Sequence, residues 1–140
     1  MTPTHNILAL DVGDRRIGVA LASLEAKIAS PLLTIDRLDT PEVFAKIIEL
    51  IDQHQVESVV VGLPRGMEGQ ETAQTASTRQ FAKDLEQAIA CKVYLQDEAA
   101  TSLAAEDELK ANNKPYQKGD IDKLAAAYIL DDWLQTNQGV

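Results

Sequence analysis

The sequence predicts a mixed α/β fold, in which helices cover both faces of a five-stranded sheet. Three apolar runs typical of strands open the chain, and short connections join them. After these runs, further strand-like segments alternate with segments of helical periodicity. The two observations together predict the element order βββαβαβαα.

The opening elements are expected to be strands. Ile7–Val12 is a nearly continuous apolar run closed by Gly13, and Ile17–Leu21 resumes after a polar stretch. A third extended run, Leu32–Ile35, follows a short connection. Short connections join antiparallel neighbours, so the opening is predicted to be a three-stranded meander.

Helices and two further strands fill the rest of the chain. Thr40, Pro41 and Glu42 provide a cap, a first-turn proline and a first-turn acid, which together indicate a helix start. β-Branched residues and a closing Gly-Leu-Pro turn favour a buried strand over Val56–Gly62. The remaining expected elements are a helix over Thr72–Ala90, a strand over Lys92–Gln96, and helices over Thr101–Asn112 and Asp120–Gln135.

Size and composition set further bounds. The 140 residues predict a single domain over residues 1–140, and 22 acidic against 13 basic residues exclude a generally basic nucleic-acid binder. Apolar stretches such as Val59–Leu63 are far shorter than the roughly 20 residues that cross a bilayer. The polar start predicts no export signal, and the single cysteine, Cys91, predicts no internal disulfide. We therefore expect a protein of the reducing cytoplasm, without membrane association.

Three acidic residues occupy positions that burial does not favour, and Asp11 is the first. It lies within the first strand, on the same face as Ile7 and Ala9, where an apolar residue is expected. An unpaired buried charge costs several kcal/mol, so this carboxylate needs an arginine, backbone amides or a cation. Arg15 and Arg16 are the nearby candidates. Capping of the tight turn that follows would explain Asp11 equally well.

The two other acids lie where strand and helix ends meet. Asp97 and Glu98 follow the fifth strand at its carboxyl end, where open α/β sheets place their binding crevice. Acids that precede a helix also interact favourably with its dipole, which is the alternative for this pair. Asp122 is consistent with a helix cap, yet it shares a helical stripe with Ala126 and Ile129 and is expected to face the sheet.

Asp11, Glu98 and Asp122 are expected to converge if the first and fifth strands are neighbours. Three clustered carboxylates repel one another, and divalent cations remove that repulsion. All-oxygen ligation favours Mg²⁺ or Mn²⁺ over zinc. His5 and His54 are isolated, so a histidine metal site is not expected.

Four segments, in order along the chain, resemble the motifs of one known family. They are Leu10–Ala20, Val60–Pro64 with Gly69, Asp97–Ser102 and Asp122–Leu130. The family is YqgF, also called RuvX, whose members are described as Holliday-junction-resolvase-like proteins and as nucleases that mature the ends of precursor 16S ribosomal RNA. The resemblance spans nearly the whole chain and implies an RNase H-like fold.

The resemblance also assigns the family's catalytic and metal-binding acids to Asp11, Glu98 and Asp122, the residues that burial singles out. One position departs from the family pattern, because an arginine is expected where this chain has Ala99. An arginine beside the metal site would hold a phosphate by a bidentate contact. Its replacement predicts weaker substrate binding and puts catalysis in question.

The predicted activity is metal-dependent phosphodiester hydrolysis, with two Mg²⁺ or Mn²⁺ ions and no histidine base. The expected substrate is precursor 16S ribosomal RNA, with branched DNA as the alternative. The Gly66–Gly69 loop suits a segment that closes over a substrate, and equally an ordinary surface loop. Phosphate contacts are expected from the following residues, each of which alone is more simply a solvated surface residue: Arg15, Arg16, Arg65, Thr101, Lys118 and Lys123.

Two other functions fit parts of the sequence. A non-catalytic module that binds nucleic acid or assists ribosome assembly would explain Ala99 in place of the family arginine. A nucleotide-binding ATPase of the sugar-kinase and actin type fits Asp11, Val12 and Gly13. That architecture uses two such domains, however, and the sequence contains no phosphate-binding Gly-x-x-x-x-Gly-Lys-Ser/Thr loop.

Overall fold

The computed structural model describes residues 5–40, 42–98, 101–112 and 115–136, with the backbone alone for residues 101–104. The strands and helices of this part follow one another in the predicted order. They are β1 (Asn6–Val12), β2 (Arg16–Ser23), β3 (Ala29–Asp36), α1 (Val43–His54), β4 (Val56–Pro64), α2 (Ala73–Ala88), β5 (Lys92–Glu98), α3 (Thr101–Ala111) and α4 (Lys118–Thr136).

The five strands form one mixed sheet in the order β3-β2-β1-β4-β5. β1 and β2 pair antiparallel, as do β2 and β3, whereas β1 with β4 and β4 with β5 pair parallel. The predicted mixed α/β fold and its opening meander are thus confirmed. The condition named for convergence of the acids, that the first and fifth strands be neighbours, is not met. Crossovers through α1 and α2 add β4 and then β5 on the same side of β1, so β4 separates the two.

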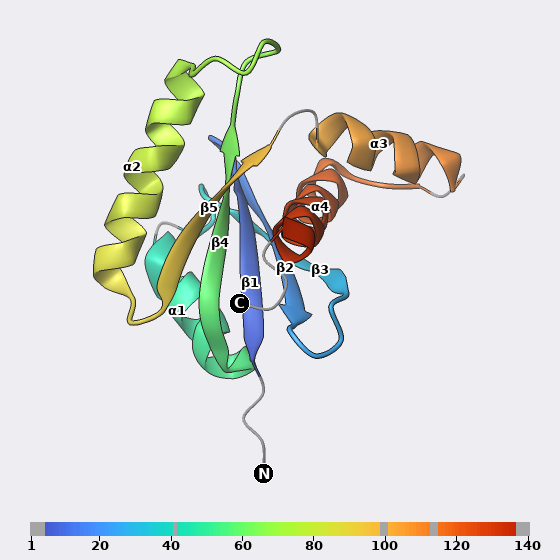
Figure 1. Ribbon diagram of the computed structural model, residues 1–140. Helices are drawn as coiled ribbons and strands as arrows, with labels where there is room; N and C mark the ends of the chain where they lie inside the picture. Colours follow the sequence, from blue (N-terminus) through green and yellow to red (C-terminus); the bar gives the residue numbers. More distant parts are fainter. Residues whose placement is uncertain (1–4, 41, 99–100, 113–114, 137–140) are drawn as a thin grey trace.

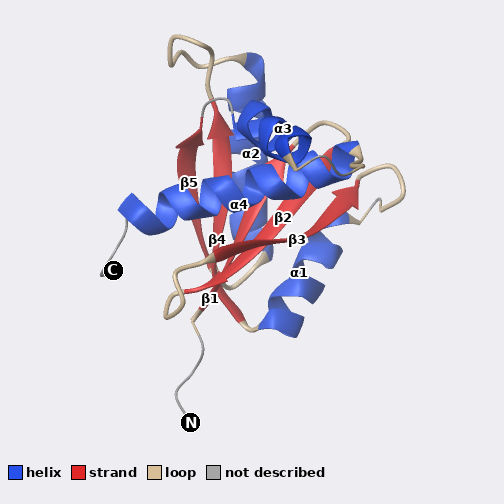
Figure 2. Cartoon of the chain, turned by 90° about the vertical axis from the view of Figure 1, so that its right-hand side faces the viewer, coloured by secondary structure: helices blue, strands red, loops and turns tan. Residues whose placement is uncertain are grey.

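Helices cover both faces of the sheet, as the sequence predicts (Figures 1 and 2). α1 and α2 lie on one face, where Leu8 and Leu10 of β1 join the buried core. α4 crosses the opposite face, where Ile7 and Ala9 pack in one cluster with Ile129. The alternation along β1 follows the two-residue period of a strand. α3 packs on α4, outside the layers that cover the sheet.

The start of α2 is tied to the end of β4. Thr72 caps the helix: its hydroxyl oxygen accepts a hydrogen bond from the Thr75 amide at 3.3 Å, and its own amide donates to Thr75 Oγ1 at 2.9 Å. Thr75 is buried, and its hydroxyl donates to the Pro64 carbonyl oxygen at 2.5 Å. Both ends of the loop between β4 and α2 are thereby fixed.

α4 begins at Lys118 rather than at Asp120. The Asp120 carboxylate accepts a hydrogen bond of 2.9 Å from the Gln117 amide, which is a capping contact of the first turn. Asp122 therefore lies inside the helix, and a capping role does not explain it. No helix in the described ranges combines the length and the apolar character that a membrane span requires.

α4 lies very close to β2 at Gly18. A Cβ atom built on Gly18 would lie 1.9 Å from the backbone carbonyl oxygen of Asp122. Carbon and oxygen atoms that are not bonded do not approach so closely, and neither backbone segment is free to yield. Glycine at this position is therefore a condition for the docking of α4.

Replacing this glycine is expected to destabilise the protein. Gly18→Ala should lower the free energy of unfolding by about 2 kcal/mol or more, because the α4 backbone must move away from β2. Urea unfolding followed by the fluorescence of Trp133 measures the change. Gly119→Ala is the matched control, since a Cβ there would lie 3.6 Å from Thr34, an ordinary contact. Equal stability of the two variants would contradict the close docking of α4.

Candidate functional site

Asp11 lies near the carboxyl end of β1, on the sheet face that α4 covers. Its partner on β2 is Gly18. On the other side, Leu10 pairs with Val61, so Gly62 follows level with Asp11 on β4. Glycines thus flank Asp11 on both neighbouring strands, and neither neighbour places a side chain beside its carboxylate.

Glu98 reaches the same region from the end of β5, although β4 separates β5 from β1. A Cβ atom built on Gly62 would lie 3.5 Å from the carboxyl carbon of Glu98 and 2.4 Å from the Ile129 side chain. The Glu98 side chain therefore extends over Gly62 of β4, in the direction of Asp11. A glycine in the intervening strand brings together acids that the sheet order keeps apart.

Asp122 approaches from α4 and is held by Arg16. Its Oδ2 accepts a hydrogen bond of 2.6 Å from Arg16 Nε. The exposed fraction is 20% for the Asp122 side chain and 31% for Arg16, so solvent screens this ion pair less than one on the open surface. Arg16, a candidate partner of Asp11 in the sequence, is instead the partner of Asp122.

The Asp11 carboxylate lies in an electrostatically unfavourable environment. Burial, followed by the negative charges of Glu98 and Asp122, raises the pKa of Asp11 to about 7. Among the described residues, none forms an ion pair or a hydrogen bond with this carboxylate. The effect of Glu98 and Asp122 on Asp11 shows that the three acids belong to one electrostatic site.

The chemistry of these donors suits a hard divalent cation. Carboxylates supply only oxygen ligands, which Mg²⁺ and Mn²⁺ prefer, and a cation would offset the repulsion at Asp11. Within the described part of the chain, no three His, Cys, Asp or Glu side chains are already grouped around one ion position. Instead, the Asp122 carboxylate accepts its hydrogen bond from the Arg16 guanidinium.

Several of the predicted phosphate-binding cations are paired with acids, as Arg16 is. Arg65 forms ion pairs with Asp97, at 3.2 Å, and with Glu71, at 3.8 Å. Lys123 Nζ lies 3.4 Å from an Asp120 carboxylate oxygen. A phosphate that binds at these positions therefore competes with carboxylates of the chain itself.

Two other predicted contacts are more open. Arg15 lies 3.9 Å from Asp36, at the limit of an ion pair, and 62% of its side chain is exposed. Lys118 is exposed at the first residue of α4. The side chain of Thr101 and the whole of Ala99 lie outside the described residues. Arg15 and Lys118 are thus the predicted contacts that stay accessible to a phosphate.

A cavity of about 500 Å³ adjoins Glu98. A larger cavity, of about 610 Å³, lies between α1 and α2 beside Phe44 and Phe81, but none of the three acids lines it. Of these two cavities, the one at Glu98 adjoins the candidate site. It is lined by the loop after β4 and by the end of β5, through Arg65, Gly66, Met67, Gly69, Asp97 and Glu98.

Arg37 supports the site, although no sequence pattern marks it. Its Nη1 donates a hydrogen bond of 2.8 Å to the Gly13 carbonyl oxygen, and its amide donates to the Arg15 carbonyl oxygen at 2.8 Å. Its guanidinium also lies 5.8 Å from the centre of the Phe81 ring, within cation–π range. Arg37 thereby holds the turn that carries Arg15 and Arg16 against α2.

Removal of the Asp11 charge is expected to stabilise the metal-free protein at alkaline pH. The pKa of Asp11 is raised from 3.8 to about 7 by burial, by Glu98 and by Asp122. The fold therefore favours protonated Asp11 and loses stability as the pH rises from about 4 to about 7. Asp11→Asn should gain on the order of 2–4 kcal/mol near pH 8, measured by thermal unfolding in EDTA.

The same comparison near pH 3 is expected to show little difference, because Asp11 is then largely protonated in both states. Asp39→Asn, at an exposed position, is the control and should behave like the wild type at both pH values. An effect of Asp11→Asn that does not change with pH would contradict the electrostatic description of the site.

Comparison with known proteins gives matches over almost the whole chain. Residues 5–136 match the family model described as RuvX, Holliday junction resolvase. A "Putative pre-16S rRNA nuclease" from Chloroflexus aurantiacus is 43% identical over 134 residues, which cover 94% of this chain and 88% of that relative. A relative of the same name from Picosynechococcus sp. is 40% identical, with 94% of this chain and 92% of the relative covered.

Among solved structures, Thermus thermophilus RuvC in complex with a Holliday junction substrate has a TM-score of 0.58 and 17% identity over 96% of each chain. At this identity the likeness concerns the fold alone, and it confirms the RNase H-like architecture that the motifs imply. The family match over residues 5–136, together with relatives that are alike over most of their length, shows that this chain belongs to the RuvX family.

Proposed function

We propose that this protein is a divalent-metal-dependent nuclease that hydrolyses phosphodiester bonds in precursor 16S ribosomal RNA. The observation that carries the proposal is geometric: Glu98 approaches at Gly62 and Asp122 at Gly18, the two glycines that flank Asp11 on the neighbouring strands. Membership of the RuvX family supports the reaction class, and the name of the relatives supports the substrate. Branched DNA, which the family description suggests, is the competing substrate.

Asp11, Glu98 and Asp122 would hold Mg²⁺ or Mn²⁺, and we expect two ions. When bound, such ions supply an activated water and stabilise the leaving oxygen. Asp122 already shares its Oδ2 with Arg16, so it would offer its other oxygen or release the guanidinium. A released Arg16 would stay beside the acids, where its planar fork suits a phosphate oxygen.

The charge of the chain favours selective over indiscriminate binding of RNA. A formal net charge of −9 repels nucleic acid over most of the surface, and several predicted phosphate-binding cations are paired with acids. Arg15 and Lys118 remain open to phosphates. We expect weak binding of arbitrary RNA and a strong dependence of binding on divalent metal.

A second candidate function is a non-catalytic module that binds RNA during ribosome assembly. The ion pair between Arg16 and Asp122 favours it, because a cation of the chain already occupies one carboxylate of the site. Ala99, in place of the family arginine, points the same way. Both functions include RNA binding, but only the nuclease cleaves the RNA, so a cleavage experiment separates them.

Cleavage is expected to require both metal and Asp11. RNA that contains precursor 16S ends, single-stranded RNA and branched DNA are incubated with the protein in Mg²⁺, Mn²⁺ or EDTA. Cleavage should be lost in EDTA and fall at least about 100-fold in Asp11→Asn, because a metal ligand is removed. Asp39→Asn should retain full activity. Cleavage that survives both EDTA and Asp11→Asn would exclude the proposal, and metal-dependent binding without cleavage would favour the module.

Metal binding is also expected to stabilise the fold. An ion that binds only the folded state adds about 2.7 kcal/mol at a concentration 100 times its Kd. Thermal unfolding of the wild type should therefore shift upward as Mg²⁺ or Mn²⁺ is added. Asp11→Asn should lose this shift, although it is the more stable protein in EDTA near pH 8. An equal shift in both proteins would mean that the ions bind elsewhere.

A further inference from the structure

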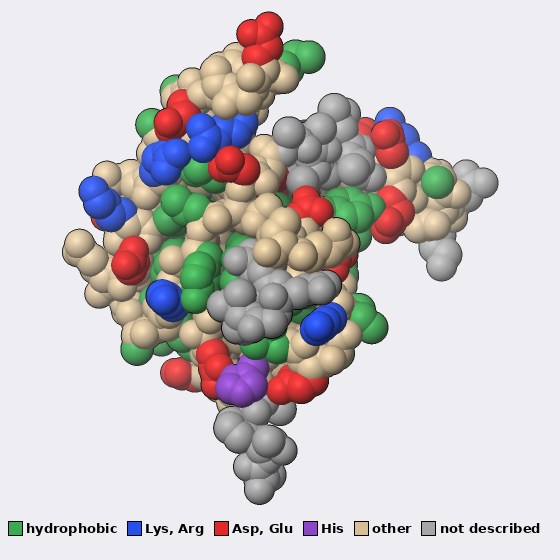
Figure 3. All heavy atoms as spheres, viewed as in Figure 1, with side chains coloured by type: hydrophobic (Ala, Val, Ile, Leu, Met, Phe, Trp, Pro, Cys, Tyr) green, Lys and Arg blue, Asp and Glu red, His purple; other side chains and the backbone are tan. Residues whose placement is uncertain are grey.

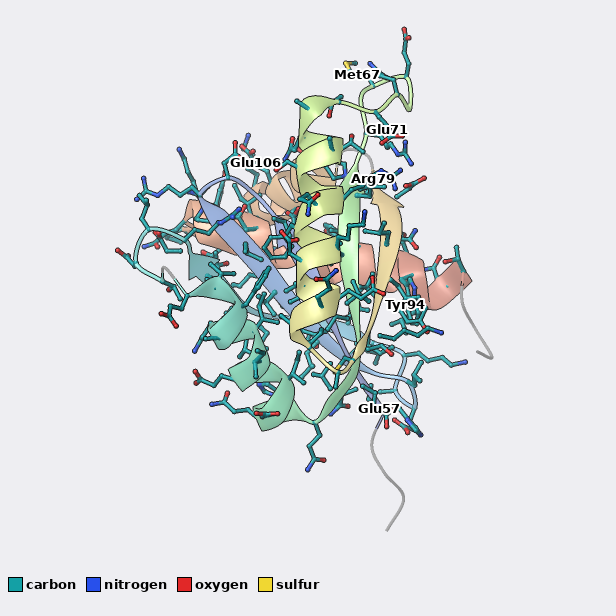
Figure 4. All side chains as sticks on the ribbon, turned by 90° about the vertical axis from the view of Figure 1, so that its left-hand side faces the viewer. Glu57, Met67, Glu71, Arg79, Tyr94 and Glu106 are labelled. Atoms are coloured by element: carbon teal, nitrogen blue, oxygen red, sulfur yellow. The ribbon has the colours of Figure 1, made fainter. Side chains whose placement is uncertain are left out.

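The loop between β4 and α2 extends beyond the end of the sheet, with Met67 near its tip. Figure 1 shows this loop as the outermost part of its end of the molecule, and Figure 4 shows Met67 at its outer edge, away from the body of the protein. Met67 is fully exposed, more than any other exposed large hydrophobic residue in the described ranges. An exposed methionine at a loop tip contributes nothing to the core.

The loop is a bonded turn with a defined shape. The Gly66 amide donates to the Gln70 carbonyl oxygen at 2.8 Å, and the Gly69 amide donates to the Gly66 carbonyl oxygen at 2.9 Å. The Gln70 side chain also accepts from the Glu68 amide at 2.9 Å. Gly69 has a φ of +82°, a conformation that favours glycine. The exposure of Met67 therefore follows from the hydrogen bonds of its own loop.

Met67 and the candidate metal ligand Glu98 line the same cavity. This cavity measures about 500 Å³, within the range of pockets that hold small ligands, and the loop forms one wall while the end of β5 forms the other. A nucleic-acid strand whose phosphate lies near Glu98 would therefore place an adjacent nucleotide beside Met67. Met67 shares a cavity with the candidate site residue Glu98, which distinguishes it from exposed residues such as Ile28.

The charges around Met67 disfavour a contact with the phosphate backbone. Glu68 and Glu71 are exposed acids of the same loop, and Figure 3 shows an acidic side chain at its outer end. Arg65, at the base of the loop, is already paired with Asp97 and Glu71. Phosphates are repelled by such a tip, whereas the uncharged face of a base is not. The thioether of methionine packs well on aromatic faces.

We propose that Met67 packs against one unstacked nucleobase of the substrate strand, next to the phosphate that the acids engage. The proposal rests on the proposed function and adds to it the feature of the substrate that is recognised, an unpaired nucleotide beside the cut. Proteins insert methionine and other apolar side chains between bases, and RNA-binding proteins select strands whose bases can turn outward.

Binding and base unstacking are measured together to test this contact. A single-stranded oligoribonucleotide carries 2-aminopurine at each position in turn, and Ca²⁺ replaces Mg²⁺ so that binding is followed separately from cleavage. At one position, the fluorescence of 2-aminopurine should increase when the wild type binds and should stay low when Met67→Ala binds. Met67→Ala should also bind about three- to ten-fold more weakly. Met67→Leu should keep most of both signals, because its side chain is apolar and of similar size.

An abasic nucleotide at the bright position gives the decisive comparison. It should weaken binding of the wild type about as much as Met67→Ala does, and it should weaken binding of Met67→Ala no further, because the two changes remove one contact. The salt dependence of the affinity should be the same in Met67→Ala and the wild type, since no phosphate contact is lost. Ile28→Ala, at an exposed apolar residue next to β3, should bind like the wild type.

Three results would each overturn the base contact. The first is unchanged affinity and fluorescence in Met67→Ala, and the second is additive losses of affinity from Met67→Ala and the abasic nucleotide. The third is no binding of the RNA. Failure of the proposed function has a different signature. If the wild type does not cut RNA in Mg²⁺, while Met67 and the base remain coupled in Ca²⁺, then the nuclease is rejected and the base contact stands.

Discussion

The close docking of α4 on the centre of the sheet is the constraint on which the rest of the structure depends. Gly18 and Gly62 make it possible, because a Cβ on either would collide with α4, at the backbone of Asp122 or at the side chain of Ile129. The same docking buries one whole face of β1 and carries Asp122 to the carboxyl end of that strand. The docking of α4 and the placement of Asp122 thus both require residues without a side chain at Gly18 and Gly62.

The docking places Asp11 in an electrostatically unfavourable position. Asp11 is partly buried beside Glu98 and Asp122, and Arg16 forms its ion pair with Asp122. An ionised carboxylate that is buried beside other acids raises the free energy of the folded state. An arrangement that lowers stability and suits divalent cations is typical of a functional site.

The chain carries a formal net charge of −9, and this shapes how a polyanion can approach the site. Arg65 and Lys123 are engaged by neighbouring carboxylates, so contacts with phosphates compete with internal ion pairs. The loop after β4 adds an apolar tip and further acids beside Glu98. In the proposed function, attraction would therefore depend on bound metal, on a few open cations and on contacts with bases, which together would favour a particular geometry of the strand over random binding.

Local patterns of the sequence determined the elements and selected the acids. Strand periodicity places Asp11 on a face that also carries Ile7, and capping at Thr72 marks the start of α2, because these signals depend only on neighbouring residues. Gly18 and Gly62 carried a signal as well, since glycine inside a strand often marks a close approach.

Only the tertiary structure decided that β4 separates β1 from β5, that Glu98 extends over Gly62, and that Arg16 pairs with Asp122. Arg16 and Asp122 are 106 positions apart in the chain, and their distance depends on how sheet and helix pack. No local pattern encodes such a distance. The sequence by itself therefore singled out the candidate site residues, and the packing of the tertiary structure determined which of them meet.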